Sequence, residues 1–458
     1  MDHPRLYWND HCTPGSDWLR FTPLSVPTDR VWTAKDDSRY LSPWLGLPGY
    51  RHTIGMARHW HFLCAFFWLA NGLFFVVLLF ATNQWKRLVP TDPALFSGAW
   101  RVFVHYATLN MPVEPDGFYR YNPLQQLAYF GVVFLIAPGS LLTGLAMSPA
   151  IDNWAGWYPR LFGGRQAARS LHFLCLIGYA GFLVPHVTMV ILTGLCQNLN
   201  HIVFGTDTTD PLGLLVFLAG LALIVLACRG THWLSWNRPR WVQMSFRHLL
   251  GPGQRFFLNR LPSRLQYTRA DISPYFWPNG KLPHDVAWER LGANRREGYQ
   301  LHVTGLVEKP ASLSFEMLER MGKTEQITLH HCIQGWSGVA EWAGVRFDDL
   351  VQLVRPLPGA RWVVFRSFGE GHYGGEYYDC LTLENARHPE TLLAWEMNGK
   401  PLSDLHGAPL RLRVENQLGY KMVKWIKSVE FVASLDQVGK GYGGKNEDDE
   451  YYPVIANI

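Results

Sequence analysis

Charge is absent from long parts of this chain. Charged residues make up only 17 % of its 458 residues, and four long apolar runs contain no Asp, Glu, Lys or Arg. Each run is close to the ~20 residues that cross a hydrocarbon core as a helix. The runs predict four transmembrane helices, near 57–81, 124–147, 169–195 and 211–234. From about residue 240 onward charge returns, and no further run of this kind exists.

Cysteine is also scarce. The seven cysteines are scattered and form no Cys-x-x-Cys motif, although Cys332 follows two histidines in "ITLHHCIQGWSG". A disulfide needs a partner, and a zinc site needs further Cys or His ligands at short spacing. Unpaired cysteines agree with a reducing compartment. Cys332 therefore needs another explanation, whereas Cys380, in "YYDCLTLE", is expected to be structural.

No small-residue cleavage site or twin-arginine start precedes the first apolar run, so we expect no cleaved signal peptide. Arginines gather before the first helix, in the loop between the second and third, and after the fourth, while 196–210 has no Lys or Arg. The positive-inside rule then places both termini and the middle loop in the cytoplasm. The segment 83–123 is a contrary sign, because it holds Lys86, Arg87, Arg101 and Arg120.

Histidines mark the predicted membrane helices. His172 and His186 are fourteen residues apart on the third helix, which is nearly four whole turns, so they share one face about 21 Å apart. His59 and His61 open the first helix. Ligating side chains at membrane depth are functional by default, and imidazole binds haem iron well. A single histidine such as His59 can instead lie at the interface or bond a carbonyl.

This ladder resembles the bacterial di-haem b-type cytochromes that are membrane subunits of formate dehydrogenases and nickel-iron hydrogenases. The resemblance implies that His172 shares a haem with His61, with His59 in reserve, and that His186 shares a second haem with His105. If His105 does not reach His186, one haem binds, and His201 is a weak substitute. One or two b-type haems are therefore expected.

The second half has a different pattern. Residues 241–265 are basic and aromatic with Gly and Pro breaks, and they predict an amphipathic connector on the membrane surface. Short alternating strands such as "QLHVTGLVE" and "RWVVFRSF" follow. The fold class is thus an all-α four-helix membrane bundle followed by an α+β domain with mixed sheet. The predicted boundaries are 1–54 for an N-terminal cytoplasmic segment, 55–240 for the bundle, 241–265 for the connector and 266–458 for the soluble domain.

Four blocks occur in order in this domain: Cys-x-x-Gly-Trp-Ser from Cys332, Glu-Met-Asn-Gly from Glu396, His-Gly-Ala-Pro-Leu-Arg from His406, and Gly-Tyr-Lys-x-Val-Lys-Trp from Gly419. Together they resemble the sulfite oxidase family of molybdopterin enzymes over about 270–458. The resemblance implies that Cys332 is the single protein thiolate on molybdenum.

The same resemblance implies further site residues. His406, Arg411, Lys421 and Lys424 hold the pterin and its phosphate, Asn279 contacts the cofactor, and His331 and Gln334 flank the metal ligand. Pro278 stands where sulfite oxidases carry an arginine, and Trp336 and Trp342 make the expected pocket aromatic. These departures bring the domain closer to the bacterial methionine sulfoxide reductase branch.

The sequence therefore predicts a multi-pass enzyme of a bacterial inner membrane. Its molybdenum–pterin domain, on the cytoplasmic side, performs oxygen-atom transfer on a small substrate and exchanges electrons with the quinone pool through b haem. Membrane lipid, a quinone and a small molecule are the expected partners, and no nucleic acid is expected. Three alternatives remain: a sulfite dehydrogenase, a reductase of S- or N-oxides, and a non-catalytic electron-transfer or redox-sensing membrane protein.

Overall fold

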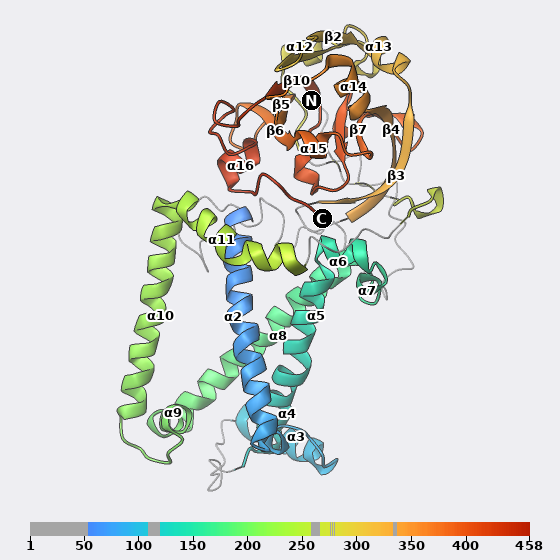
Figure 1. The fold of residues 1–458 in the computed structure, drawn as a ribbon. Helices are drawn as coiled ribbons and strands as arrows, with labels where there is room; N and C mark the ends of the chain where they lie inside the picture. The colour runs from blue at the N-terminus through green and yellow to red at the C-terminus, as the bar shows by residue number, and fades with distance from the viewer. Residues whose placement is uncertain are drawn as a thin grey trace. The chain divides into compact units, whose positions relative to one another are not determined.

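The computed structural model describes residues 54–108, 120–257, 266–332 except 275, 277 and 279, and 337–458 (Figure 1). Their contacts form two compact units. One unit contains the residues up to 59 together with 148–166 and 243–458, and the other contains 60–147 and 167–242. Each unit is described by itself. The predicted domain boundaries remain predictions, since this division by contacts follows a different principle.

Four helical spans are long and apolar enough to cross a membrane: Arg58–Ala81, Pro123–Ala146, Ala167–Leu192 and Leu212–Asn237. They confirm the four helices expected from the charge-free runs. Few of their side chains are buried inside the protein, which fits helices that face lipid. The third helix ends before the predicted residue 195 because Gly194 adopts a φ of 123° that other residues rarely adopt.

The helices that contain these spans are α2 (Ile54–Ala81), α4 (Pro123–Phe130) with its continuation η4 (Gly131–Ile136) and α5 (Ala137–Ala146), α8 (Arg165–Leu192) and α10 (Leu212–Asn237). Short helices flank them: η3 (Gln84–Arg87), α3 (Ala94–Ala107) and α9 (Leu195–Phe204). Asn122 and Gln125 form a capping box at the start of α4. The middle of this span is a π-helical turn, η4, which precedes Pro138. Bulges of this kind are frequent at functional sites.

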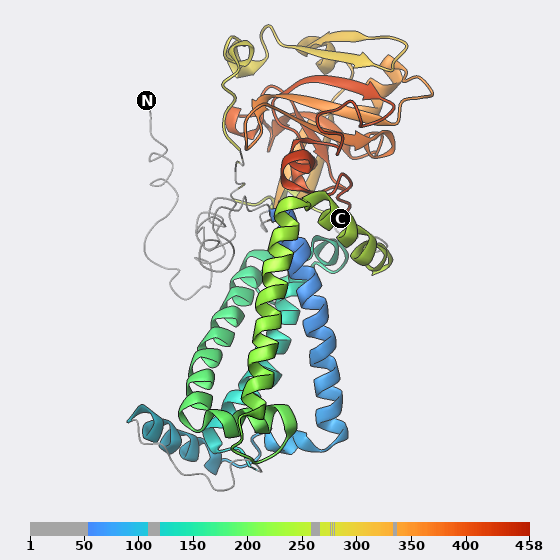
Figure 2. The same ribbon diagram turned by 90° about the vertical axis from the view of Figure 1, so that its left-hand side faces the viewer.

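The described residues of the soluble domain form ten strands in two sheets. The strands are β1 (Gln300–Gly305), β2 (Ala311–Ser314), β3 (Thr324–His331), β4 (Ser337–Arg346), β5 (Trp362–Glu370), β6 (Glu376–Thr382), β7 (Thr391–Met397), β8 (Lys400–Pro401), β9 (Arg411–Val414) and β10 (Ile426–Val432). One sheet has the order β2-β1-β10-β5-β6, and the other has β3-β4-β7-β8 with β9 also on β7. In the first sheet β1 and β10 pair in parallel and the other described neighbours pair antiparallel, so this sheet is mixed as predicted. Figure 2 shows these strands from a second direction.

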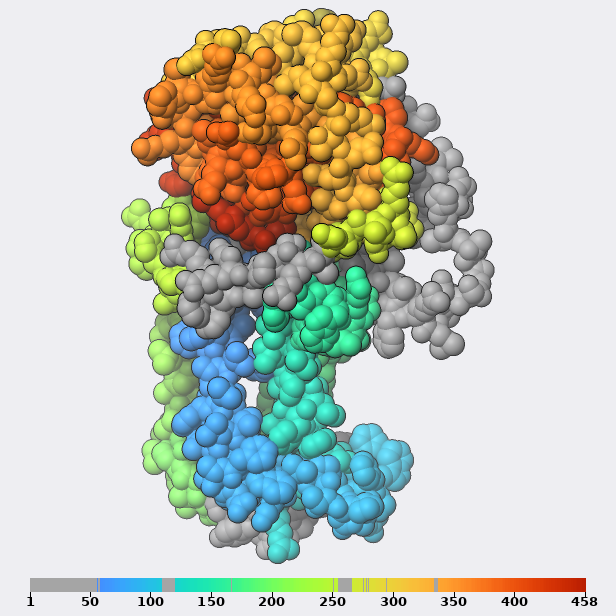
Figure 3. All heavy atoms as spheres, turned by 45° about the vertical axis from the view of Figure 1, so that its right-hand side comes forward, coloured from blue at the N-terminus to red at the C-terminus, as the bar shows by residue number. Residues whose placement is uncertain are grey.

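Short helices connect the strands and complete the domain: η5 (Arg269–Asp271), α12 (Val286–Glu289), η6 (Ala293–Arg295), α13 (Phe315–Arg320), α14 (Phe347–Val354), α15 (Leu383–Ala386), η7 (Asp404–His406), η8 (Gly419–Lys421) and α16 (Lys445–Glu450). The strands and helices of this domain pack closely, as Figure 3 shows in yellow to red.

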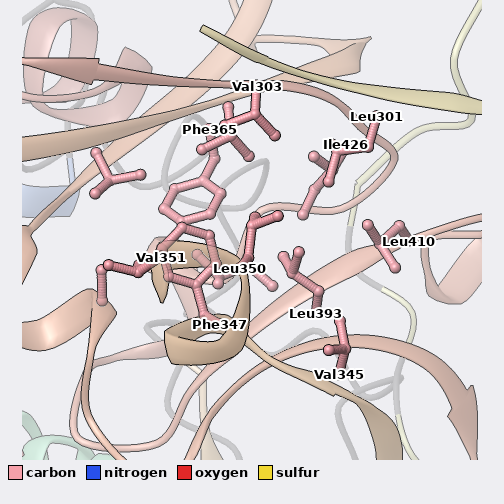
Figure 4. Packing of buried hydrophobic residues seen from close by; sticks show 14 of the residues in the cluster. Leu301, Val303, Val345, Phe347, Leu350, Val351, Phe365, Leu393, Leu410 and Ile426 are labelled. Atoms are coloured by element: carbon pink, nitrogen blue, oxygen red, sulfur yellow. The ribbon is translucent and has the colours of Figure 1, made fainter. Parts of the chain in front are cut away.

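The core of the domain forms between its two sheets and around α14 (Figure 4). Phe347 on α14 lies 5.2 Å from the ring of Phe365 on β5, measured between ring centroids. Val345 and Leu393 come from the other sheet and are also fully buried. Burying each such side chain stabilises the fold by about 1.5–3 kcal/mol. The core therefore holds both sheets, and with them the strand ends that carry the motifs.

The compact unit that contains the soluble domain also includes two segments that are close in sequence to the membrane helices, 148–166 and the part of 239–257 from residue 243 onward. The helices α6 (Pro149–Trp154) and α7 (Trp157–Arg160) lie in the segment 148–166, and α11 (Pro239–Phe257) covers most of the predicted connector. On α11 the side chain of Gln243 donates to the main-chain oxygens of Tyr451 and Tyr452 at 3.0 and 3.1 Å. Part of α11 is thus held by protein, and residues 258–265 lie outside the described residues.

Candidate cofactor sites

The strands β3 and β4 form a hairpin that carries Cys332. His331, the last residue of β3, pairs with Ser337, the first of β4. Cys332 is the first residue of the turn and is only 4 % exposed, packed in a cluster with Phe276, Trp342 and Ala408. Gln334 and Trp336 lie outside the described residues. The hairpin therefore presents a single buried thiol at one end of two strands held by the core.

His406 lies at the end of η7, where Ser403 caps the helix by accepting from its main-chain nitrogen. The imidazole Nε2 is 3.2 Å from the main-chain oxygen of Phe276 and must donate to it, so Nδ1 accepts from the Ser403 hydroxyl at 2.8 Å. Because Phe276 also packs with Cys332, this bond brings the His406 motif to the hairpin. Burial lowers the pKa of His406, which favours this neutral form.

Arg411 and Lys424 meet beside the loop that follows His406. Arg411 donates to the main-chain oxygen of His406 at 2.9 Å, and Lys424 donates to that of Leu405 at 2.7 Å. Gly407, with a φ of 111°, lies between them, and a Cβ there would come within 3.0 Å of Lys424 and 3.2 Å of Arg411. The glycine of the motif is therefore needed for this close approach.

This pair of cations suits an anionic cofactor. Burial, then the charge of Arg411, lowers the pKa of Lys424 well below its usual range. The pKa of Arg411 is also lowered well below its usual range, first by burial and then by the charge of Arg413. The Arg411 Nε is buried without a hydrogen-bond partner in the part of the chain that the structure describes. A phosphate would satisfy that donor and stabilise both charges, so the residues fit the phosphate-bearing pterin.

Asn279 lies outside the described residues, but its neighbour Gly280 does not. A Cβ at Gly280 would lie 3.8 Å from the Lys424 Nζ and 3.6 Å from the Trp425 ring. The Lys424 ammonium also lies over that ring, 4.1 Å from its centroid. Gly280, the residue after Asn279, thus lies close to Lys424. The contact of Asn279 with the cofactor remains a prediction.

Beside the predicted Arg411 and Trp342, this region contains three residues that the sequence analysis missed: His330, Arg413 and Glu415. Trp342 is fully buried, and the Cζ atoms of Arg411 and Arg413 lie 4.6 and 4.2 Å from the centroid of its ring. Arg413 forms two bonds to Glu415, at 2.9 and 2.8 Å, and a third contact of 3.1 Å with His330 Nδ1. The sequence "RLR" on β9 could have indicated Arg413, since alternate residues of a strand share a face and Arg411 was already predicted in the site.

His331 has both ring nitrogens engaged by protein. Its Nδ1 lies 3.1 Å from an Arg165 nitrogen, and its Nε2 lies 2.8 Å from the Asn153 Oδ1. The side chain is fully buried, and burial, followed by the charge of Arg165, lowers its pKa well below the usual value. A contact of His331 with the cofactor or the substrate remains a prediction.

Lys421 lies in a different environment from the other predicted cofactor ligands. Its ammonium is fully buried and donates to Asp379 and Glu447, the latter at 2.6 Å. Two carboxylates already satisfy its charge, so no added anion is needed there. The structure thus brings together Cys332, His406, Arg411 and Lys424, and it places Lys421 in a buried ion-pair cluster. Cofactor binding by Lys421 stays a prediction.

In the other unit, His61 and His172 face each other. Their ring centroids are 6.1 Å apart and the rings are nearly perpendicular. The Nδ1 of His172 donates to the main-chain oxygen of Ser140 at 2.9 Å, because a carbonyl can only accept. This bond leaves Nε2 of His172 unprotonated, which is the form that binds a metal ion. The pair fits two axial ligands of one haem iron.

The remaining candidate histidines are less clearly paired. His186 stacks on Phe182, with ring centroids 5.0 Å apart, and meets the edge of Tyr129. His105 is exposed on α3, and within the described residues no ring contact or hydrogen bond joins it to His186. The ring of His59 lies 5.6 Å from Phe246, and His201 pairs with Asp207. The second haem pair therefore remains a prediction.

Comparison with known families agrees with this division of the chain. Residues 290–437 match the family described as oxidoreductase molybdopterin binding domain. Residues 26–205 match the family described as prokaryotic cytochrome b561. The two matches lie on the two parts that carry the Cys332 hairpin and the histidine pair.

Among curated proteins, the chain is 31 % identical over 153 residues to the putative protein-methionine-sulfoxide reductase subunit YedZ1 of Azospira oryzae, which is 33 % of this chain and 54 % of that protein. It is 34 % identical over 149 residues to the protein-methionine-sulfoxide reductase catalytic subunit MsrP of Xanthomonas campestris pv. campestris, which is 30 % of this chain and 46 % of that protein. The chain thus spans about half the length of the curated relatives that it matches.

A solved structure, the sulfane dehydrogenase SoxCD from Paracoccus pantotrophus, matches 30 % of this chain and 39 % of its own, with 24 % identity and a TM-score of 0.27. That likeness is too low to support an argument. The family matches and the four membrane-spanning helices lead to the conclusion. The chain thus combines a membrane-spanning region that is similar to prokaryotic cytochrome b561 with a region that is similar to molybdopterin-binding oxidoreductase domains.

Proposed function

We propose that the protein is a membrane-bound molybdenum–pterin oxidoreductase that takes electrons from the quinone pool through b haem and reduces a sulfoxide. The observation that carries the proposal is the buried Cys332 thiol beside the His406, Arg411 and Lys424 cluster. The sulfoxide is the preferred substrate because the matched relatives are named as methionine sulfoxide reductase subunits. Sulfite oxidation is the second candidate.

Each residue of the site would have a separate role. Cys332 would supply the protein thiolate to molybdenum, a soft ligand for that metal. Arg411 and Lys424 would hold the anionic part of the pterin, and the neutral His406 would fix the loop between them. When bound, the cofactor supplies two-electron oxygen-atom transfer chemistry. The aromatic ring of Trp342 and the buried cluster around Cys332 would limit the access of water.

In the membrane domain, His61 and His172 would hold one haem. A second haem between His186 and His105 would give the di-haem arrangement seen in the cytochrome b subunits of formate dehydrogenases and hydrogenases. The fusion has a chemical reason, since molybdenum alternates by two electrons whereas haem passes one at a time. A haem chain would therefore pass single electrons between quinol and the metal.

Metal analysis and haem spectra of the purified protein test this function. We expect molybdenum and b haem in one preparation, and we expect dithionite-reduced haem to be reoxidised by methionine sulfoxide. Cys332→Ser should keep the haem spectrum and abolish this reoxidation. Cys380→Ala is the matched control, because Cys380 is a buried thiol of the same domain in a separate cluster.

Three results would contradict the proposal in different ways. Haem reduction by sulfite, without reoxidation by sulfoxides, would favour the second candidate. Normal turnover by Cys332→Ser would exclude the role of the thiolate. A protein that holds both cofactors and responds to neither substrate class would favour an electron-transfer or sensing protein.

A further inference from the structure

One guanidinium nitrogen bridges the two strands that carry the Cys332 turn. The Arg165 Nη1 contacts Nδ1 of His331, the last residue of β3, at 3.1 Å, and donates to the hydroxyl of Ser337, the first residue of β4. His331 Nδ1 and the Ser337 hydroxyl are themselves 3.1 Å apart. Since Cys332 is the next residue after His331, this contact lies directly at the base of its turn.

The imidazole of His331 is held in one orientation and one protonation form. Arginine has only donors, so Nδ1 of His331 must accept, and the ring proton must be on Nε2. Nε2 then donates to the Asn153 Oδ1 at 2.8 Å. An exchange of the two nitrogens by a ring flip would place donor against donor and acceptor against acceptor. Arg165 and Asn153 thus fix the ring from two sides.

The position of Arg165 is unfavourable for a positive charge for two reasons. It is the first residue of α8, whose first turn contains no acidic residue, and a cation is unfavourable at a helix N-terminus. It is also only 6 % exposed, and a buried charge needs compensation. Asp152 provides part of this compensation, since the charge of Arg165 opposes the rise that burial causes in the Asp152 pKa.

We propose that Arg165 and Asn153 are positioning residues for Cys332. They come from the segment 148–166, between the second and third membrane-spanning helices, and belong to the same compact unit as the hairpin. By holding His331 and Ser337 together, they fix the ends of the two strands and with them the position of Cys332, which directly follows His331. This inference rests on the proposed role of Cys332 as the molybdenum ligand. It implies that the range 266–458 alone lacks part of its own site.

The test uses the full chain, purified in detergent with its cofactors. The variants are Arg165→Ala, Arg165→Lys and Asn153→Ala, with Arg160→Ala as the control because Arg160 is an exposed arginine of the same segment. We would measure hydrogen–deuterium exchange in peptides that cover residues 327–342, and the electron paramagnetic resonance signal of Mo(V).

We expect Arg165→Ala and Asn153→Ala to raise exchange in these peptides at least threefold and to change the Mo(V) signal, with the haem spectrum unchanged. Arg165→Lys keeps the charge and one nitrogen that can donate, so it should recover part of both effects, which a general loss of folding would not allow. Arg160→Ala should match the wild type.

The proposal is overturned if exchange in the Arg165→Ala and Asn153→Ala proteins stays within threefold of the wild type and the Mo(V) signal is unchanged. If Arg165→Ala does not fold, the same criteria applied to Arg165→Lys and Asn153→Ala decide. A wild-type protein without molybdenum would defeat the proposed function. The exchange measurement would then still show whether the segment 148–166 holds the hairpin.

Discussion

The rings of His61 and His172 lie 6.1 Å apart between centroids, on two different membrane-spanning helices. We predict that His61→Ala and His172→Ala each remove the same haem, because each takes away one axial ligand. His59→Ala should keep it, since the His59 ring packs against Phe246. Pyridine haemochrome content per protein measures the loss. Full haem content in His172→Ala would contradict the pairing.

The number of haems follows from the same measurement. If two haems bind, His172→Ala should lower haem content by about half, and His186→Ala should lower it by half through the other site. A wild-type protein with one haem per chain would exclude the ladder and the role of His105. The exposed position of His105 makes this the more exacting test of the two.

We predict that Arg411 is needed for cofactor binding, whereas Arg413 is needed for the stability of the fold. Arg411→Gln removes a buried cation that carries an unsatisfied donor, so we expect the pterin and molybdenum content to fall at least tenfold with little change in melting temperature. Arg413→Gln removes the ion-pair partner of Glu415, whose side chain is 6 % exposed, and leaves it with the neutral donor Gln326. Breaking a buried pair in this way costs about 3–5 kcal/mol. Melting temperature and cofactor content, measured on both variants, test the contrast, and equal effects would contradict it.

The membrane helices were predictable because their signals are local. A charge-free run determines a transmembrane helix almost alone, and the end of α8 differed only because Gly194 breaks it. The blocks from Cys332 and His406 predicted neighbours that the fold does bring together through Phe276.

The buried environment of Lys421 and the contact of Arg165 depend on partners that are distant in the sequence. Lys421 follows the motif in sequence, but its partners Asp379 and Glu447 lie 42 and 26 residues away, and no local pattern announces them. Arg165 is 166 residues from His331. The sequence shows Arg165 as one of several arginines near a membrane helix and does not indicate its contact with His331. Only tertiary structure shows that its side chain is buried against the hairpin.

The Lys421 cluster predicts a dependence of stability on pH. Burial, and then the charge of Glu447, raises the pKa of Asp379 well above its usual value, and burial also raises that of Glu447. Two carboxyl groups share one lysine, so the folded protein retains a proton that the unfolded chain releases above pH ~4. Stability should then fall as pH rises from there towards the raised pKa, by about 1.4 kcal/mol per pH unit.

Asp379→Asn should remove most of this slope, because Lys421 and Glu447 are left as a neutral pair. Lys421→Met should destabilise the protein at every pH above the carboxyl range, since it leaves buried carboxyls without a cation. Melting temperatures of the full chain between pH 5 and 9 measure both effects. A wild-type slope in Asp379→Asn would show that the retained proton is held elsewhere.

The last prediction concerns the side of the membrane on which the molybdopterin domain lies. Arginines cluster before the first span, between the second and third, and after the fourth, and this distribution predicts a cytoplasmic domain. Arg165, one of these arginines, contacts His331 within one compact unit, so the segment 148–166 and the hairpin should share one side. A fluorescent-protein fusion after Ile458 should therefore be bright, and an alkaline phosphatase fusion there should be inactive. A phosphatase fusion after Gly205, in the short loop that holds no Lys or Arg, is the matched control and should be active. The reverse pattern at the two positions would place the substrate outside the cytoplasm and would assign the Lys86 and Arg87 segment to the inner face.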